Sequence, residues 1–183
     1  MVETTTPVCR FGTLAPDFAL PDPLGRVWTL DECRGEKGTI VMFICNHCPF
    51  VKAILDRLVR DTRELQQHGV NSVAIMSNDP ARYAEDSREN MAVVAQQYDF
   101  CFPYLVDADQ RIAEAYAAVC TPDFFGYDAN LDLQYRGRLD ASGMQAAPAG
   151  ARRELFEAML QVARTGSGPV EQVPSIGCSI KWL

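Results

Sequence analysis

Residues 40–49 read Ile40-Val41-Met42-Phe43-Ile44-Cys45-Asn46-His47-Cys48-Pro49, and this stretch decides the fold. The segment from Thr39 to Ile44 is apolar throughout its length, which is typical of a strand buried on both faces of a sheet. Pro49 suits the first position of a helix, because its missing N–H has no partner to lose there. The stretch therefore predicts a central strand that leads into a helix, with Cys45 and Cys48 at the junction.

Two residues separate these cysteines, and a pair with this spacing at a helix start carries redox chemistry. The N–H groups and the macrodipole of a helix N-terminus favour a thiolate over a thiol. One cysteine can then attack a disulfide, and the other can close the mixed intermediate. His47 lies between them, and its protonated form would stabilise a thiolate and make the pair more oxidising. The alternative is a solvent-exposed His47 with little effect.

Length and composition set the class of protein. The chain has 183 residues, 48% of them hydrophobic, which predicts one domain spanning 1–183. Its net charge is −7 and no basic stripe with interleaved aromatic residues is visible, so we expect no nucleic-acid partner. No apolar run approaches the ~18 residues that span a bilayer, so we expect no membrane partner. The first residues do not resemble a signal peptide, which predicts a cytoplasmic location.

The rest of the chain alternates helix and strand patterns. The helix from Pro49 is followed by a buried strand over 70–76, an amphipathic helix over 82–98, a short strand over 102–106 and a helix over 110–119. Strands over 124–127 and 131–135 form a hairpin, and a helix over 151–165 closes the domain. Residues 18–20 and 27–29 predict an N-terminal hairpin. We expect a loosely held arm over 1–12 and an apolar, packed tail over 167–183.

This order predicts an α/β fold with a mixed central sheet and helices on both faces. Right-handed crossovers make the first strands parallel, and the late hairpin adds an antiparallel edge. Parallel strands present their carboxyl ends at one rim of the sheet. The loop that carries the cysteine pair and the loop over 77–80 should therefore meet at that rim.

Several segments, in the expected order, resemble the thioredoxin-fold redoxins of the AhpC/TSA group. They are Phe11 to Phe18, the Cys-Asn-His-Cys motif at 45–48 and Val119 to Phe125, and a peroxiredoxin-like thioredoxin subgroup also shares Pro174 to Trp182. The resemblance implies a thioredoxin-like three-layer sandwich. It also implies that Cys45, as the more exposed thiol, attacks and that Cys48 resolves.

The resemblance further implies that the bond between Thr121 and Pro122 is cis. A cis peptide in this turn would expose backbone polar groups beside the thiols, forming an edge on which an extended substrate peptide can lie. Thr121 and Pro122 are therefore supporting site residues by this interpretation.

The sequence also departs from the relatives that it resembles. Peroxiredoxins orient peroxide with a P-x-x-x-[T/S]-x-x-C pattern. If Cys45 were the peroxidatic cysteine, the Pro and Thr/Ser positions would hold Gly38 and Met42. If Cys48 were, they would hold Val41 and Cys45. Neither cysteine fits the pattern, so fast peroxide reduction is not expected. Thioredoxin has a buried acid on the strand before its cysteine pair, and this strand has none. Proton transfer must therefore use water, His47 or an acidic residue from another part of the chain.

These observations predict an enzyme, a thiol–disulfide oxidoreductase that cycles Cys45 and Cys48 between dithiol and disulfide. Its substrates would be protein or small-molecule disulfides, and a thiol system would donate electrons. No nucleotide-binding motif is present, and no further zinc ligands are grouped with the pair, so we expect no cofactor and no metal. One alternative is an atypical thiol peroxidase with Cys45 peroxidatic and Cys48 or Cys178 resolving. The other is a non-enzymatic metal-binding or redox-gated binding module.

The remaining cysteines divide into two groups. Cys178 in the tail is either an extra resolving thiol or a buried packing residue, and Cys120 lies close enough to Pro122 to approach the site. The others, Cys9, Cys33 and Cys101, are expected to be structural, since buried thiols behave as small hydrophobic residues in a reducing compartment.

Overall fold

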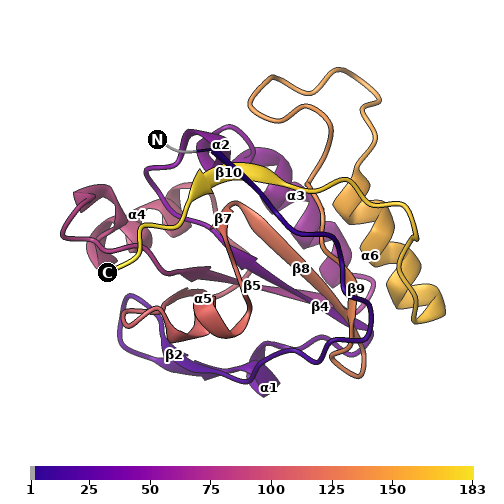
Figure 1. The fold of residues 1–183 in the computed structure, drawn as a ribbon, viewed down its shortest axis with the longest axis horizontal. Coiled ribbons are helices and arrows are strands. Elements are labelled where there is room, and N and C mark those ends of the chain that lie inside the picture. Colours follow the sequence, from indigo (N-terminus) through magenta and orange to yellow (C-terminus); the bar gives the residue numbers. More distant parts are fainter. Residues whose placement is uncertain (1–2) are drawn as a thin grey trace.

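A five-stranded mixed sheet lies at the centre of the computed structural model, which describes residues 3–183 (Figure 1). Its order is β6-β5-β4-β8-β9. β4 pairs in parallel with β5, and β5 pairs in parallel with β6, whereas β8 is antiparallel to both β4 and β9. The predicted mixed sheet is therefore confirmed. The strands are β4 (Gly38–Phe43), β5 (Val70–Met76), β6 (Tyr104–Val106), β8 (Asp123–Asp128) and β9 (Leu133–Tyr135).

Helices cover both faces of this sheet, which is why β4 is buried at every position. Because successive strand residues point to opposite faces, Ile40 and Met42 join one core cluster while Val41 and Phe43 join the other. The first cluster also holds the apolar faces of α3 (Leu55–Gln66), α4 (Arg88–Gln97) and α6 (Glu154–Thr165), and the second those of α1 (Leu30–Cys33) and α5 (Arg111–Ala115). The predicted three-layer sandwich is thus confirmed.

The N-terminal hairpin is also present. β2 (Ala19–Pro21) pairs antiparallel with β3 (Val27–Thr29). Thr29 and Glu32 then form a capping box at the start of α1, in which each side chain accepts a hydrogen bond from the other residue's backbone N–H.

Four predicted helices have different bounds in the structure, and one of them, the closing helix predicted over 151–165, begins at Glu154. The helix that starts at Pro49 is divided into α2 (Pro49–Lys52) and α3. The helix predicted over 82–98 begins later, because Ser87 caps α4 and a 3₁₀ turn, η1 (Ala84–Asp86), precedes it. The helix predicted over 110–119 ends with α5, since Ala117 has a left-handed φ of 50° and the chain then enters β7 (Cys120–Thr121).

A second sheet, in the order β1-β10-β7, joins the two ends of the chain (Figure 1). β10 (Ile176–Ser179) pairs antiparallel with β1 (Glu3–Thr5) on one side and with β7 on the other. The prediction of a loosely held arm is therefore wrong over the described residues 3–6: Thr6 is buried, and its N–H donates to the Ser175 carbonyl. Residues 1–2 of that arm lie outside the described part. The tail packs against the domain through β10, where Cys178 is buried, and through Ile180 beyond it, whereas Val170 and Leu183 are exposed.

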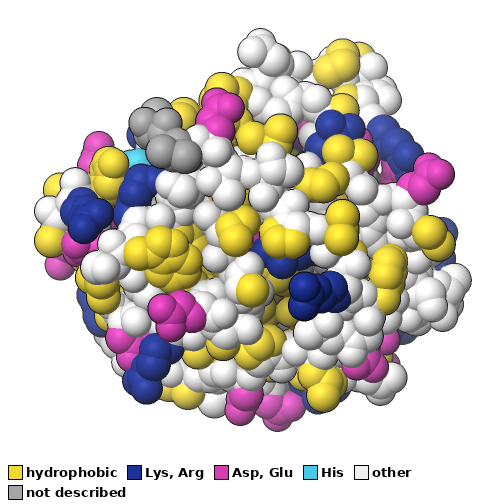
Figure 2. All heavy atoms as spheres, viewed as in Figure 1, with side chains coloured by type: hydrophobic (Ala, Val, Ile, Leu, Met, Phe, Trp, Pro, Cys, Tyr) yellow, Lys and Arg dark blue, Asp and Glu magenta, His cyan; other side chains and the backbone are white. Residues whose placement is uncertain are grey.

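The surface and the helix lengths bear on partners. Figure 2 shows acidic and basic side chains interspersed around one face of the molecule, between stretches of uncharged surface. Within residues 3–183, every helix is too short or too polar to cross a bilayer.

Candidate active site

The loop that carries the cysteine pair leaves the carboxyl end of β4 and enters α2. Cys48 is the N-cap of α2, and Pro49 is its first residue. Cys45 precedes this cap by three residues. Both thiols are buried, with 1% of Cys45 and none of Cys48 exposed. The expected difference in exposure is therefore negligible, and neither thiol is open to solvent.

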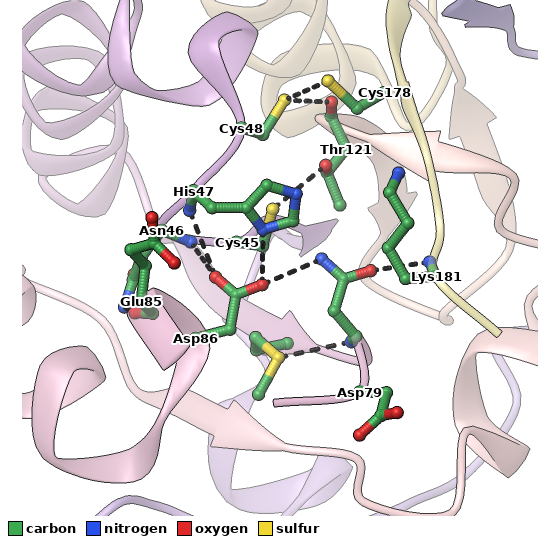
Figure 3. A network of polar contacts seen from close by, with 12 residues as sticks. Cys45, Asn46, His47, Cys48, Asp79, Glu85, Asp86, Thr121, Cys178 and Lys181 are labelled. Atoms are coloured by element: carbon green, nitrogen blue, oxygen red, sulfur yellow. Dashed lines mark hydrogen bonds and ion pairs between the residues drawn. The ribbon is translucent and has the colours of Figure 1, made fainter. Parts of the chain in front are cut away.

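Thr121 touches both thiols from the neighbouring strand (Figure 3). Its hydroxyl lies 3.3 Å from the Cys45 Sγ, and its carbonyl accepts a hydrogen bond of 3.1 Å from the Cys48 thiol. The bond between Thr121 and Pro122 is cis, as predicted. The cis turn places this carbonyl against the cysteine loop.

A third thiol completes the cluster. The Cys178 Sγ on β10 lies 3.1 Å from the Cys48 Sγ, and both residues are almost fully buried. In Figure 3 the two sulfurs face one another above the Thr121 carbonyl. The structure thus brings the tail cysteine to Cys48 rather than to Cys45.

The three thiols differ in acidity. Hydrogen bonding from the Cys45 thiol, which outweighs burial, lowers the pKa of Cys48 to about 5, with further help from Cys178, Thr121 and the Val51 N–H. Burial raises the pKa of Cys45 well above its ordinary value, and the contacts with Cys48 and the nearby charge of Asp86 raise it further. Burial and the contact with Cys48 raise the pKa of Cys178 to about 12. Of the three thiols, Cys48 is therefore the one whose pKa is lowered.

His47 is held by an acid that the sequence interpretation missed. Its Nδ1 lies 2.6 Å from Oδ2 of Asp86, and its ring stacks on Tyr83 with 3.9 Å between centroids. The side chain is only 5% exposed, and Nε2 is buried without a hydrogen-bond partner. The alternative of a solvent-exposed His47 is therefore excluded.

Asp86 also organises the backbone of the cysteine loop. Its Oδ1 accepts hydrogen bonds from the N–H groups of Asn46 and His47, and its Oδ2 accepts one from Asn78. Burial alone would raise the pKa of Asp86, but the bonds from His47 and the backbone hold it below its ordinary value. Asp86 is thus a buried acid beside the cysteine loop that comes from another part of the chain. Its sequence context resembles that of Glu85 and Glu89 beside it, so no local signal separates it from these exposed acids.

Metal-ligating groups gather more closely than the sequence suggests. One ligand atom each from Cys45, His47 and Asp86 lies within 4.8 Å of the others. A structural zinc site takes four ligands, and both oxygens of Asp86 already accept hydrogen bonds here. Asp86, which is not grouped with the pair in sequence, is brought to it by the fold, and the arrangement is that of a hydrogen-bonded acid–histidine pair.

The other cysteines lie outside this cluster or are inert within it. Cys120 is buried on β7 with its Sγ 3.5 Å from the Pro122 carbonyl, and burial raises its pKa. Burial also raises the pKa of Cys9 to about 11 and that of Cys33 to about 12. Cys101 contacts the Thr62 hydroxyl on α3.

The edge beside the cis peptide is already occupied. Cys178 and Ser179 of β10 are in register with Thr121 and Cys120 of β7. The expected edge for a substrate peptide is therefore not open in this structure. A pocket of about 330 Å³ lies next to it, lined by Phe50, Pro122 and Ile176 among others.

Comparison with known proteins places these features in context. Residues 11–137 match the model of the AhpC/TSA family. The chain is 27% identical over 119 residues to the thiol-disulfide oxidoreductase ResA of Geobacillus thermodenitrificans, covering 65% of this chain and 64% of that protein, so it spans less than two thirds of this curated relative.

Two solved structures resemble the chain over all or nearly all of its length, and a third resembles part of it. An uncharacterised conserved protein from Geobacillus kaustophilus is 43% identical to this chain, with a TM-score of 0.92. The alignment covers 100% of this chain and 97% of that protein's chain. A hypothetical protein from Sinorhizobium meliloti is 39% identical with a TM-score of 0.89, covering 98% of each chain. The thioredoxin domain of a Bacteroides vulgatus thiol-disulfide oxidoreductase is 16% identical with a TM-score of 0.58, covering 69% of this chain and 86% of its own, and shows the shared fold.

Proposed function

The chain belongs to the AhpC/TSA family, whose model matches most of its length, and on that premise we propose that it is a thiol–disulfide oxidoreductase. The observation that carries the proposal is the position of Cys48, which is the N-cap of α2 and lies 3.1 Å from both the Thr121 carbonyl and the Cys178 sulfur. Hydrogen bonding from the Cys45 thiol favours its thiolate by lowering its pKa to about 5. A thiolate with a second thiol in contact is the arrangement that exchanges disulfides.

In the first step the Cys48 thiolate attacks one sulfur of a substrate disulfide. A bond forms between Cys48 and that sulfur, and the substrate's sulfur–sulfur bond breaks as the other half leaves with the electron pair. Cys48 rather than Cys45 is the attacking residue, because only its thiolate is stabilised. This reverses the roles that the resemblance implies.

In the second step Cys45 closes the mixed disulfide. Asp86 holds Nδ1 of His47, and one ring nitrogen of His47 lies within 4.8 Å of the Cys45 sulfur, which supports His47 as the base that takes the proton of the Cys45 thiol. The Cys45 thiolate attacks the Cys48 sulfur, and the second half of the substrate leaves as a thiolate. Two electrons pass to the substrate, and a partner dithiol returns them to the enzyme.

The enclosure of the site restricts the substrate. Because β10 covers the edge of β7, the substrate is a small disulfide or a flexible segment that enters by the apolar pocket between Phe50 and Pro122. A thiol system supplies the electrons. The cytoplasmic location fits the buried thiols of Cys33 and Cys120, which pack as hydrophobic residues.

Trapping of the mixed disulfide tests the proposal. Reduced Cys48→Ser protein should neither turn over glutathione disulfide nor become glutathionylated at the remaining site thiols. Cys45→Ser/Cys178→Ser, which keeps Cys48 but removes both thiols that contact it, should instead be modified at Cys48 and lose steady-state turnover. Modification of Cys45 in the Cys48→Ser variant, at the rate seen for the native protein, would refute the assignment.

A thiol peroxidase is the second candidate, favoured by the position of Cys48 at the N-cap directly before Pro49 in an AhpC/TSA chain. A peroxide would oxidise the Cys48 thiolate to a sulfenic acid, and a neighbouring thiol would displace water to form a disulfide. Stopped-flow peroxide consumption separates the two candidates: a second-order rate no faster than that of a free thiol leaves only disulfide exchange.

A further inference from the structure

We propose that Cys178 is a third catalytic thiol, carried on β10 in the place of an extended substrate, which forms a disulfide with Cys48 in competition with Cys45. This inference rests on the proposed function, since it uses the same Cys48 sulfur. It goes beyond that function because it assigns the carboxyl-terminal strand to the reaction.

The contact between the two sulfurs is the first support. They lie 3.1 Å apart, and Cys178 is 1% exposed. A disulfide holds its sulfurs about 2 Å apart, so closure requires an approach of about 1 Å. The 130 residues between these cysteines make this a tertiary contact that only the fold creates.

The pairing of the strand is the second support. β10 lies antiparallel to β7 with Cys178 opposite Thr121, in the manner of an extended peptide added to a sheet edge. Gly177 permits this approach, because a Cβ there would lie 2.2 Å from the Thr121 carbonyl oxygen and 3.0 Å from the Pro122 nitrogen. The strand thus approaches the cis peptide at a distance that a larger residue would prevent.

Both ends of the strand are fastened to the site. Before it, the Ser175 hydroxyl donates a hydrogen bond of 2.9 Å to the Pro122 carbonyl. After it, the Lys181 N–H donates one of 2.8 Å to Asn78, whose amide donates to Asp86. Figure 3 shows this chain of contacts from the tail to the acid that holds His47. The tail is therefore part of the site rather than a loose end lying over it.

The step itself balances with the proposed function. When Cys48 carries one half of a substrate disulfide, Cys178 attacks the Cys48 sulfur, a bond between the two cysteines forms and the bond to the substrate breaks. The departing thiolate takes the electron pair and the proton of Cys178. Cys45 can then attack Cys48 and release Cys178, which moves the disulfide to the Cys45–Cys48 pair.

Disulfide mapping after oxidation tests the inference. Reduced native protein, Cys45→Ser, the double variant Cys45→Ser/Cys178→Ser and the control Cys101→Ser are treated with glutathione disulfide, quenched in acid, alkylated and mapped by mass spectrometry. We expect Cys45→Ser to form a Cys48–Cys178 disulfide and release both glutathione molecules. We expect the double variant to stop at the Cys48 mixed disulfide, with a lifetime longer by about tenfold or more.

The outcomes separate the two proposals. If folded Cys45→Ser stops at the mixed disulfide with Cys178 alkylated, while the native protein forms Cys45–Cys48, Cys178 is a packing residue and the proposed function stands. If the native protein and Cys101→Ser form neither disulfide, the proposed function fails with the inference. Should Cys45→Ser fail to fold, Cys45→Ala takes its place, and the absence of a Cys48–Cys178 disulfide in that variant overturns the inference.

A backbone variant gives an independent readout. Gly177→Ala should lift β10 from the Thr121 carbonyl and reduce the Cys48–Cys178 disulfide by about tenfold without affecting Cys45–Cys48. Ser179→Ala, on the same strand but without this close approach, is the matched control. Equal yields of the Cys48–Cys178 disulfide in both variants would contradict the role of the strand.

Discussion

Oδ2 of Asp86 lies 2.6 Å from Nδ1 of His47, and the other oxygen of this carboxylate binds the backbone of the same loop. Asp86 ends η1, which lies beyond β5, whereas His47 follows β4. One buried acid thus fixes the ring of the histidine and the path of the chain between the two cysteines. The predictions below follow from this pair and from the thiols that it adjoins.

Asp86→Asn should destabilise the reduced protein by about 1–3 kcal/mol, because an amide presents N–H groups to partners that are themselves donors. Urea unfolding measures the change. The pKa of Asp86 is lowered in the folded protein. The native protein should therefore keep its full extra free energy of unfolding over Asp86→Asn above the ordinary pKa of 3.8, and lose it as the pH falls below that value. Glu85→Gln is the control, because the Glu85 side chain is exposed and only its carbonyl contacts Asn46. Equal stability of the two variants would refute the role of Asp86.

His47→Phe should slow the second half of the reaction and spare the first. A phenyl ring retains the stack on Tyr83 but removes both the bond to Asp86 and the base for Cys45. In rapid-quench experiments we expect the Cys48 mixed disulfide to form at the native rate and to resolve about 10²-fold more slowly. His68→Phe, at the exposed histidine after α3, should leave both phases unchanged. A slower first phase alone would place His47 beside the attacking thiolate instead.

Alkylation of Cys48 should follow a single titration near pH 5, because that is the pKa to which its partners lower it. The depressed pKa also makes stability depend on pH. Relative to Cys48→Ser, the reduced native protein should gain stability as the pH rises from about 5 towards the ordinary thiol value of 9.0, and lose that gain as the pH falls through 5. Iodoacetamide kinetics and urea unfolding across this range measure the two effects. A titration at the ordinary value would show that Cys45 does not stabilise the thiolate.

Arg136→Met should destabilise the protein by about 3–5 kcal/mol, because it leaves Asp123 charged and buried directly after the cis peptide. The guanidinium is 2.9 Å from the Asp123 carboxylate, and Asp123 is not exposed at all. Burial raises the pKa of Asp123 even with this partner present. Because protonation removes the unpaired charge, the loss of stability in Arg136→Met should become smaller as the pH falls towards 3.8. Removing both charges with Asp123→Leu/Arg136→Met should recover most of the stability, and thermal unfolding measures each step. No recovery in the double variant would mean that packing, not charge, explains the loss.

The elements that were predicted well are those whose signals are local. The apolar run before Cys45 specified a strand with both faces covered, and Pro49 specified the first residue of a helix. The start predicted for the helix over 82–98 was too early, because Asp86 points inward and accepts a hydrogen bond from the backbone of His47, which lies 39 residues before it in the sequence. No periodicity in that segment reports such a partner.

The sequence by itself determined the order of strands and helices, and therefore the rim of the sheet at which Cys45, His47 and Cys48 lie. These follow from periodicity and capping, which act over a few residues. Only the tertiary structure decided which thiol is ionised, which acid holds the histidine, and that β10 lies on the edge beside the cis peptide. Acidity and strand pairing depend on burial and on atoms within a few ångströms, and those atoms come from parts of the chain as distant as Thr121 and Cys178.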